Sequence, residues 1–178
     1  MLLVVKSMNS TGRMTVVLPH GALFHKGAEG KIRKALLEQD FLETVISLGP
    51  NVFYGTQLAA CVIVFKQNKE PEHKRKVLFI DASDQIMVGR AQNFLGPEHV
   101  HQIYSWYCDY ANVENYVKVA TMGDLQENDF NLNIPLYVEK VIEDNLPSVE
   151  EAMADLKQAS LAAEEKFKSV LRKFVGEQ

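Results

Sequence analysis

The sequence predicts an α/β fold, and three observations lead to it. An apolar, β-branched run at 14–18 and a second predicted strand at 42–48 flank a segment at 29–41 whose apolar side chains recur at helical spacing. A third and more apolar run follows at 58–65, after a loop too short to hold a helix. Strand, helix and strand make a βαβ unit, so we expect a mostly parallel sheet. The runs at 42–48 and 58–65 are expected to pair antiparallel, with one of them at the sheet edge.

The first part of the chain is punctuated by turn residues. Residues 1–9 are typical of the end of a helix, closed by the turn at Ser10-Thr11-Gly12. The run 14–18 is apolar and β-branched and stops at Pro19, which predicts a strand buried on both faces. Gly49-Pro50 ends the next strand in the same way.

The remainder of the chain is more mixed. A short strand is expected at 77–80 and a second helix at 97–110, with Pro97 in its first turn. Residues 111–147 are aromatic and irregular, and a long periodic segment follows them. The predicted organisation has three regions: a sheet region at 1–83, a mixed helical and loop region at 84–147, and a tail helix at 148–178.

Composition excludes several classes of protein. The chain has 178 residues, of which 47% are hydrophobic and 24% charged, so it can bury a core and is not disordered as a whole. No apolar run approaches the roughly 18 residues that a membrane span needs, and the opening residues do not form a signal peptide. We therefore expect a cytoplasmic protein. A net charge of −4 argues against nucleic-acid binding by bulk electrostatics, although a local basic face is compatible with it.

Motifs for cofactors, metals and nucleophiles are missing from the sequence. It contains neither G-x-G-x-x-G nor G-x-x-x-x-G-K-[ST], and no G-x-S-x-G. The five histidines and two cysteines have no metal-binding spacing; His99 and His101, for example, would point to different faces of a helix. We predict no metal site and no nucleotide-type cofactor site in this chain.

One loop between two predicted strands carries adjacent aromatic residues. Phe53 and Tyr54 lie in the segment Asn51-Val52-Phe53-Tyr54-Gly55-Thr56. Loops of this kind can frame the ligand crevice of an open α/β sheet. The residues taken alone favour a structural role, in which Phe53 caps the core and Tyr54 covers a turn.

Two asparagines in the later region alternate with apolar residues. Asn131 and Asn133 lie in the segment Asp129–Pro135. The alternation suits a short edge strand that shows its amides to a partner or to base edges. It suits a solvated turn ended by Pro135 equally well, and the sequence leaves both interpretations open.

The tail has a heptad pattern. Its apolar and small residues are separated alternately by four and three positions, and Ser148 with Glu151 forms a capping-box pattern at its start. A helix of this length would be about 40 Å long at 1.5 Å per residue and needs a partner surface for its seam. The predicted partner-binding residues are Val149, Met153, Leu156, Phe167, Val170 and Phe174.

Several blocks of the sequence, in order, resemble the modification subunit of type I restriction–modification systems, a family of adenine-N6 DNA methyltransferases. The resemblance covers nearly the whole chain. Its blocks are Gly12–Phe24, Gly30–Leu37, Asn51–Thr56, Ala60–Phe65, Val77–Ala82 and Asp129–Pro135.

The resemblance implies the C-terminal part of a Rossmann-like, S-adenosylmethionine-dependent methyltransferase sheet, followed by a C-terminal helical region. The runs 14–18, 42–48 and 60–65 would be the last three strands of that sheet. The family's cofactor loop and its Asn/Asp-Pro-Pro-aromatic motif both precede this part, and no two prolines are adjacent here. S-adenosylmethionine would therefore bind elsewhere in the complete subunit. A fragment, a truncated gene product and an expressed C-terminal piece are all compatible with this.

The resemblance also implies roles for particular residues. The target adenine must leave the duplex before its N6 can be reached, and in related enzymes an aromatic residue before the last sheet hairpin contacts the flipped base. Phe53 holds that position, with Tyr54 as the weaker candidate. Asn131 and Asn133 are the candidate DNA-binding residues. The tail helix would pack on the specificity subunit, in a system that also has a restriction subunit, or on a second copy of itself.

These features leave three functions to compare. The first is the DNA-facing and subunit-facing part of an adenine methyltransferase. The second is a non-catalytic interaction module that associates through its C-terminal helix. The third, a complete small α/β enzyme, is disfavoured because the sequence holds no nucleotide loop, metal site or nucleophile motif.

Overall fold

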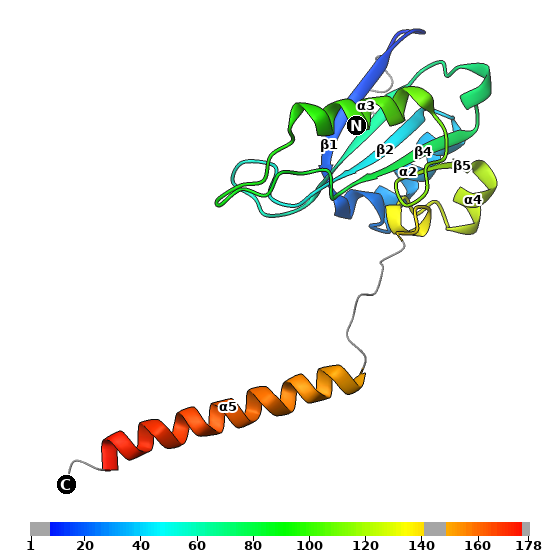
Figure 1. Cartoon of the computed structure of the whole chain (residues 1–178). Helices are drawn as coiled ribbons and strands as arrows, with labels where there is room; N and C mark the ends of the chain where they lie inside the picture. Colours follow the sequence, from blue (N-terminus) through cyan, green and yellow to red (C-terminus); the bar gives the residue numbers. More distant parts are fainter. Residues whose placement is uncertain (1–7, 141–148, 176–178) are drawn as a thin grey trace. The chain divides into compact units, whose positions relative to one another are not determined.

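A computed structural model describes residues 8–140 and 149–175, and within them five strands form one sheet in the order β1-β3-β2-β4-β5 (Figure 1). The helix end predicted at 1–9 lies almost entirely outside these residues, as does the capping residue Ser148. The strands are β1 (Arg13–Pro19), β2 (Leu42–Leu48), β3 (Ala60–Lys66), β4 (Lys76–Ala82) and β5 (Val117–Thr121). The α-helices are α2 (Ala28–Glu38), α3 (Pro97–Asp109), α4 (Met122–Glu127) and α5 (Val149–Val175), and short 3-10 helices are η1 (His20–Leu23), η2 (Pro71–His73) and η3 (Ile134–Leu136).

The α/β prediction is confirmed, but the expectation of a mostly parallel sheet is wrong. Among neighbouring strands only β2 and β4 are parallel; β1–β3, β2–β3 and β4–β5 are antiparallel. The antiparallel pairing of β2 with β3 was predicted correctly. Neither of them lies at the sheet edge, because β3 inserts between β1 and β2 and leaves β1 and β5 outermost.

Strand β1 differs from its prediction in burial. Its residues alternate between exposed and half-buried instead of being buried on both faces, and Val17 is 49% exposed. The physical reason is its place at the edge, since only β3 pairs with it in the described part of the chain. Strand β2 shows the opposite pattern, with every residue buried.

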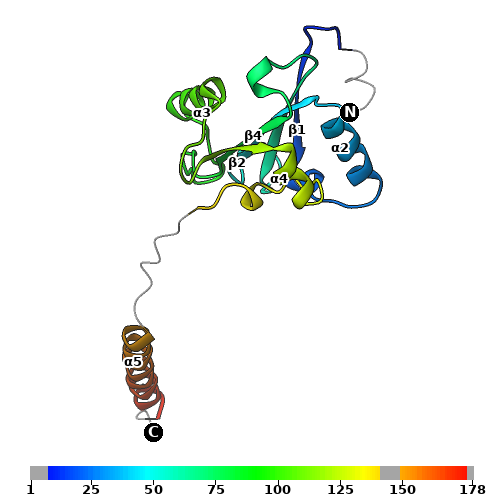
Figure 2. The same cartoon turned by 90° about the vertical axis from the view of Figure 1, so that its right-hand side faces the viewer.

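Helices cover both faces of the sheet (Figure 2). Helices α2 and α4 pack on one face, where Leu37 and Leu125 join Phe65 and Phe79 in one apolar cluster. Helix α3 packs on the other face, where Trp106 belongs to a second cluster. The sheet unit is therefore a three-layer sandwich with a separate core on each side.

A buried arginine joins three segments on the α2 face. The Arg33 guanidinium donates hydrogen bonds to the carbonyl oxygens of Ala22, His25 and Phe130, at 3.1, 3.2 and 2.9 Å. Burial lowers the pKa of Arg33 from its usual value, and the nearby Glu29 carboxylate partly offsets this. The side chain thereby ties helix α2 to the loop after β1 and to the turn at residues 128–131.

Helix α5 forms a unit of its own, apart from the sheet unit. Its 27 residues confirm the predicted tail helix, and Met153, Leu156 and Phe167 are each more than 60% exposed. Val149, Val170 and Phe174 lie within the helix, and their side chains fall outside the description. In the described residues, none of the helices has the length and apolar character that crossing a membrane requires.

Replacing Arg33 with Met is expected to destabilise the sheet unit by about 2–4 kcal/mol, because three carbonyl oxygens lose their donors inside the fold. Urea unfolding measures the change. The matched control is Lys34→Met on the same helix: Lys34 is half exposed, pairs with Glu38 at 3.8 Å and lies 5.0 Å from the centroid of the Phe130 ring, so its loss should cost about 1 kcal/mol or less. Equal stabilities of the two variants would contradict the bracing role of Arg33.

Candidate functional site

One edge of the sheet gathers three loops. Strands β1, β2 and β4 run in the same direction, and their last residues, Pro19, Leu48 and Ala82, lie at neighbouring register positions through β3 and β4. The loops at 20–27, 49–59 and 83–96 therefore all leave the sheet at this edge, which we call the loop edge. In open α/β sheets the carboxyl ends of parallel strands are where ligands bind.

The predicted aromatic residues lie in the loop between β2 and β3. Phe53 is 37% exposed and Tyr54 96% exposed, and neither belongs to the buried clusters. The interpretation in which Phe53 caps the core therefore does not hold. Both residues belong to the loop at 49–59, at the loop edge.

His20 fixes the start of another loop at the same edge. Its Nε2 lies 3.0 Å from the carbonyl oxygen of Ala60 and 3.3 Å from Ser47 Oγ. The ring thus spans from the end of β1 to β3 and β2. Its contacts are with the sheet itself, which indicates a positioning role for the loop that follows.

Asn131 and Asn133 do not form an edge strand. They lie in a turn in which Asn131 Oδ1 accepts the Asn133 amide at 3.0 Å and the Asn131 carbonyl accepts Tyr137 Oη at 2.5 Å. The turn is not simply solvated either, because Leu132 and Ile134 between and beyond the asparagines are buried. The amide of Leu132 donates to the Leu23 carbonyl, which holds the turn against the loop after β1.

A basic hollow adjoins this turn. It has a volume of about 390 Å³ and lies at the start of helix α2. Three lysines, four residues of the turn and the buried Arg33 are among its lining. The members that bear on charge and hydrogen bonding are Lys26, Lys31, Lys34, Asp129 and Asn131.

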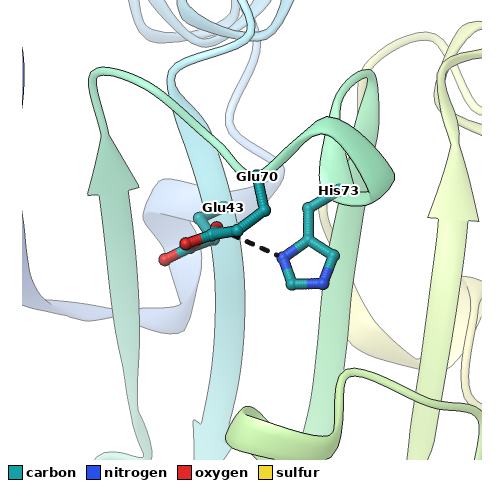
Figure 3. Close-up of side chains that lie close together, drawn as sticks. All are labelled: Glu43, Glu70 and His73. Atoms are coloured by element: carbon teal, nitrogen blue, oxygen red, sulfur yellow. Dashed lines mark ion pairs between the residues drawn. The ribbon is translucent and has the colours of Figure 1, made fainter.

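A group with metal-ligand character lies at the opposite edge of the sheet. The carboxylates of Glu43 and Glu70 and the His73 ring come within 4.8 Å of one another (Figure 3). Glu43 starts β2, and the other two lie in the connection from β3 to β4. Lys66 Nζ lies 3.4 Å from Glu43 Oε1 and 2.5 Å from Glu70 Oε2, so an ammonium group already holds the place between the two carboxylates.

Neighbouring groups complete this ion-pair cluster. Tyr107 Oη donates to Glu43 Oε2 at 2.7 Å, and burial together with that carboxylate raises the pKa of Tyr107. The hydrogen bond from Lys66 lowers the pKa of Glu70. The His73 ring stacks on Tyr110 at 3.6 Å between centroids. These contacts join β2, the β3–β4 connection and helix α3, so the ion-pair cluster stabilises this end of the sheet.

Two of the loops at the loop edge differ from the glycine-rich turn on which a nucleotide-like cofactor such as S-adenosylmethionine rests. The loop after β1 turns directly into η1, where Leu23 is 1% exposed and fills the space beneath it. Asp81 near the end of β4 and Asp84 in the loop after it are both paired with Lys140, at 3.3 and 3.2 Å. Neither loop presents the glycine-rich backbone on which a nucleotide-like cofactor rests.

The chain matches a known protein family and is similar to known sequences. The model of the N-6 DNA methylase family matches residues 1–145. A type I restriction enzyme methylase subunit from Methanocaldococcus jannaschii is 34% identical over 167 residues. The match covers 92% of this chain and 28% of that subunit, so the chain spans less than a third of the relative's length.

Solved structures give the same result. The crystal structure of the type I restriction–modification methyltransferase subunit from Streptococcus thermophilus matches 72% of this chain and 27% of that one, with 42% identity and a TM-score of 0.69. A structure of a type I restriction–modification assembly matches 96% of this chain and 37% of its own, with a TM-score of 0.55. At 19% identity, the second likeness concerns the fold alone.

Proposed function

Because the chain belongs to the N-6 DNA methylase family, we propose that it is a portion of the DNA adenine-N6 methyltransferase subunit of a type I restriction–modification system. Its part in that subunit would be to contact the target base and the DNA and to bind the specificity subunit. Such a role would place it in the cytoplasm, with the DNA.

The observation that carries this proposal is the edge strand β1, which pairs with β3 on one side only in the described part of the chain. The strand is half exposed, and an apolar hollow lies on each side of it, one of about 380 Å³ on the α3 face and one of about 450 Å³ on the α2 face. Val62 and Ile103 line the first, and Ile63 and Leu36 line the second. A sheet that ended here would expose apolar surface on both faces.

We infer that the rest of the same subunit covers this edge. A further strand from that part of the subunit would pair with β1, and helices from the same part would fill the two hollows. Strands β1, β2 and β3 would then be the last three strands of a Rossmann-like sheet. This chain matches only 28% of a related subunit, so the remainder of such a subunit is long enough to provide that strand and those helices. Pairing with the free edge also removes the aggregation risk of an open strand.

The chemistry then divides between this chain and the rest of the subunit. The target adenine leaves the duplex, and Phe53 offers a ring face for it, with Tyr54 beside it in the same loop. Lysines of the basic hollow, with Asn131, would contact the DNA backbone nearby. The methyl donor and the groups that hold the adenine N6 belong to parts outside this chain.

The tail helix supports a second function, that of an interaction module. Met153, Leu156 and Phe167 follow the heptad spacing and are exposed on α5. Helices of the specificity subunit are the proposed partner, with self-association as the competing arrangement. This function would hold even if the chain took no part in methylation.

The isolated chain is expected not to bind S-adenosylmethionine, because its described loops offer no cradle for the cofactor and its sequence has no adjacent prolines. Calorimetric titration of the folded chain tests this. Saturable binding at micromolar affinity would contradict the proposed division of the site.

In a complete subunit that carries this sequence, Phe53→Ala should weaken methylation by the loss of one stacking face, worth about 1–3 kcal/mol. The side chain is already partly exposed, so the melting temperature should change little. Phe53→Tyr keeps the ring face and should stay near full activity. A variant that melts early but keeps its turnover per folded molecule would return Phe53 to a structural role.

Phe167→Asp is expected to abolish association through α5, because a partner interface would then bury an unpaired charge. Co-purification with the specificity subunit and sedimentation of the chain alone are the measurements. Gln158→Asp, at an exposed position off the heptad seam, is the matched control and should leave association intact. If Phe167→Asp also leaves both kinds of association intact, the heptad interpretation is wrong.

A further inference from the structure

The loop that carries Phe53 and Tyr54 is held from one side by the connection between β4 and α3. In Figure 1 the two loops extend side by side from the loop edge, one in cyan and one in green. Four hydrogen bonds join residues 50–52 of the first loop to residues 91–93 of the second. No sequence motif marks this contact, because its members are about 40 residues apart.

Three of the bonds come from the second loop and are aimed at backbone carbonyls of the first. Gln92 Nε2 donates to the Val52 carbonyl at 2.8 Å. Asn93 donates through its backbone N–H to the Asn51 carbonyl and through its side-chain Nδ2 to the Pro50 carbonyl, both at 2.9 Å. The fourth runs the other way, from Asn51 Nδ2 to the Ala91 carbonyl at 3.1 Å.

The geometry leaves little slack at either end of this contact. Asn51 has a φ of 57°, a left-handed conformation that asparagine tolerates better than most residues. A Cβ on Gly49 would lie 2.7 Å from the Ser83 carbonyl oxygen and 2.9 Å from the Ile86 side chain, so the two loops approach too closely there for any other residue. Met87 and Phe94 exchange backbone hydrogen bonds and shape the second loop as a hairpin.

We propose that Gln92 and Asn93 are positioning residues for the base-contacting loop. The carbonyl that Gln92 holds belongs to the peptide bond leading directly into Phe53, so this bond fixes the direction in which the ring leaves the backbone. A ring that must meet a flipped base within a few tenths of an ångström gains rate from being held in place beforehand. This inference rests on the proposed function, because it assumes that Phe53 contacts the target adenine.

The test compares Gln92→Glu with Gln92 in a complete subunit that carries this sequence. The substitution keeps the size of the side chain but replaces its N–H donor with an oxygen, which repels the Val52 carbonyl. Gln102→Glu makes the same chemical change at an exposed position of α3 and is the matched control. Asn93→Asp removes the donor to Pro50 and provides a second variant.

Two measurements decide the outcome. Amide hydrogen exchange of residues 51–58 should become several-fold faster in Gln92→Glu and Asn93→Asp, and stay unchanged in Gln102→Glu. At saturating DNA, kcat should fall about tenfold, the scale of one lost hydrogen bond, while the Kd for DNA stays within twofold. Exchange that does not change, or a fall in DNA affinity that accounts for the whole loss of rate, would overturn the positioning role.

The same measurements on Phe53→Ala separate this inference from the proposed function. If Phe53→Ala leaves methylation unchanged, the base-contacting role fails, whatever the exchange rates show. If Phe53→Ala impairs methylation but Gln92→Glu speeds exchange without lowering kcat, the base contact stands and the positioning role is overturned.

Discussion

The insertion of β3 between β1 and β2 is the constraint on which the rest of the molecule depends. Because β3 runs against both neighbours, the connections entering and leaving it alternate between the two edges of the sheet. The short loop from β2 to β3 is thereby forced to turn at the edge where the parallel strands end. The topology thus places the aromatic pair of that loop at the loop edge, and the conformation of the loop sets how the rings are directed there.

Much of the sheet could be predicted from local pattern. The run at 60–65 is buried on both faces, and such burial leaves a continuous apolar signal in the sequence. Strand β2 is buried throughout as well, and its β-branched residues and the Gly49-Pro50 stop predict it although Glu43 and Ser47 interrupt the apolar run. Strand β1 has a similar apolar signal but lies half exposed. An apolar run indicates that a strand suits burial, but it carries no information on whether the segments that would bury it are present. No such signal predicts strand β5, because Lys118 and Thr121 interrupt the apolar pattern of its five residues.

The candidate site was accessible to the sequence only in part. Phe53 and Tyr54 are conspicuous as adjacent aromatics between two strands, and the family resemblance gave them a role. Gln92 and Asn93 carry no such signal, because their function lies in hydrogen bonds to distant backbone carbonyls. Asn131 and Asn133 were noticed for their alternation, yet the structure uses Asn131 to shape a turn that packs against the loop after β1. The basic hollow beside it could not be predicted from local sequence, because its lining comes from two segments about a hundred positions apart.

The central claim is that this chain completes a larger methyltransferase sheet at β1 and presents Phe53 to the target adenine. The most direct test is a cryo-electron microscopy structure of a complete subunit that carries this sequence, bound to DNA containing its target site. The account predicts a further strand paired with β1, both apolar hollows filled by the same subunit, and the Phe53 ring against an extrahelical adenine. A sheet that still ends at β1, or a target base seated far from residues 51–56, would contradict it.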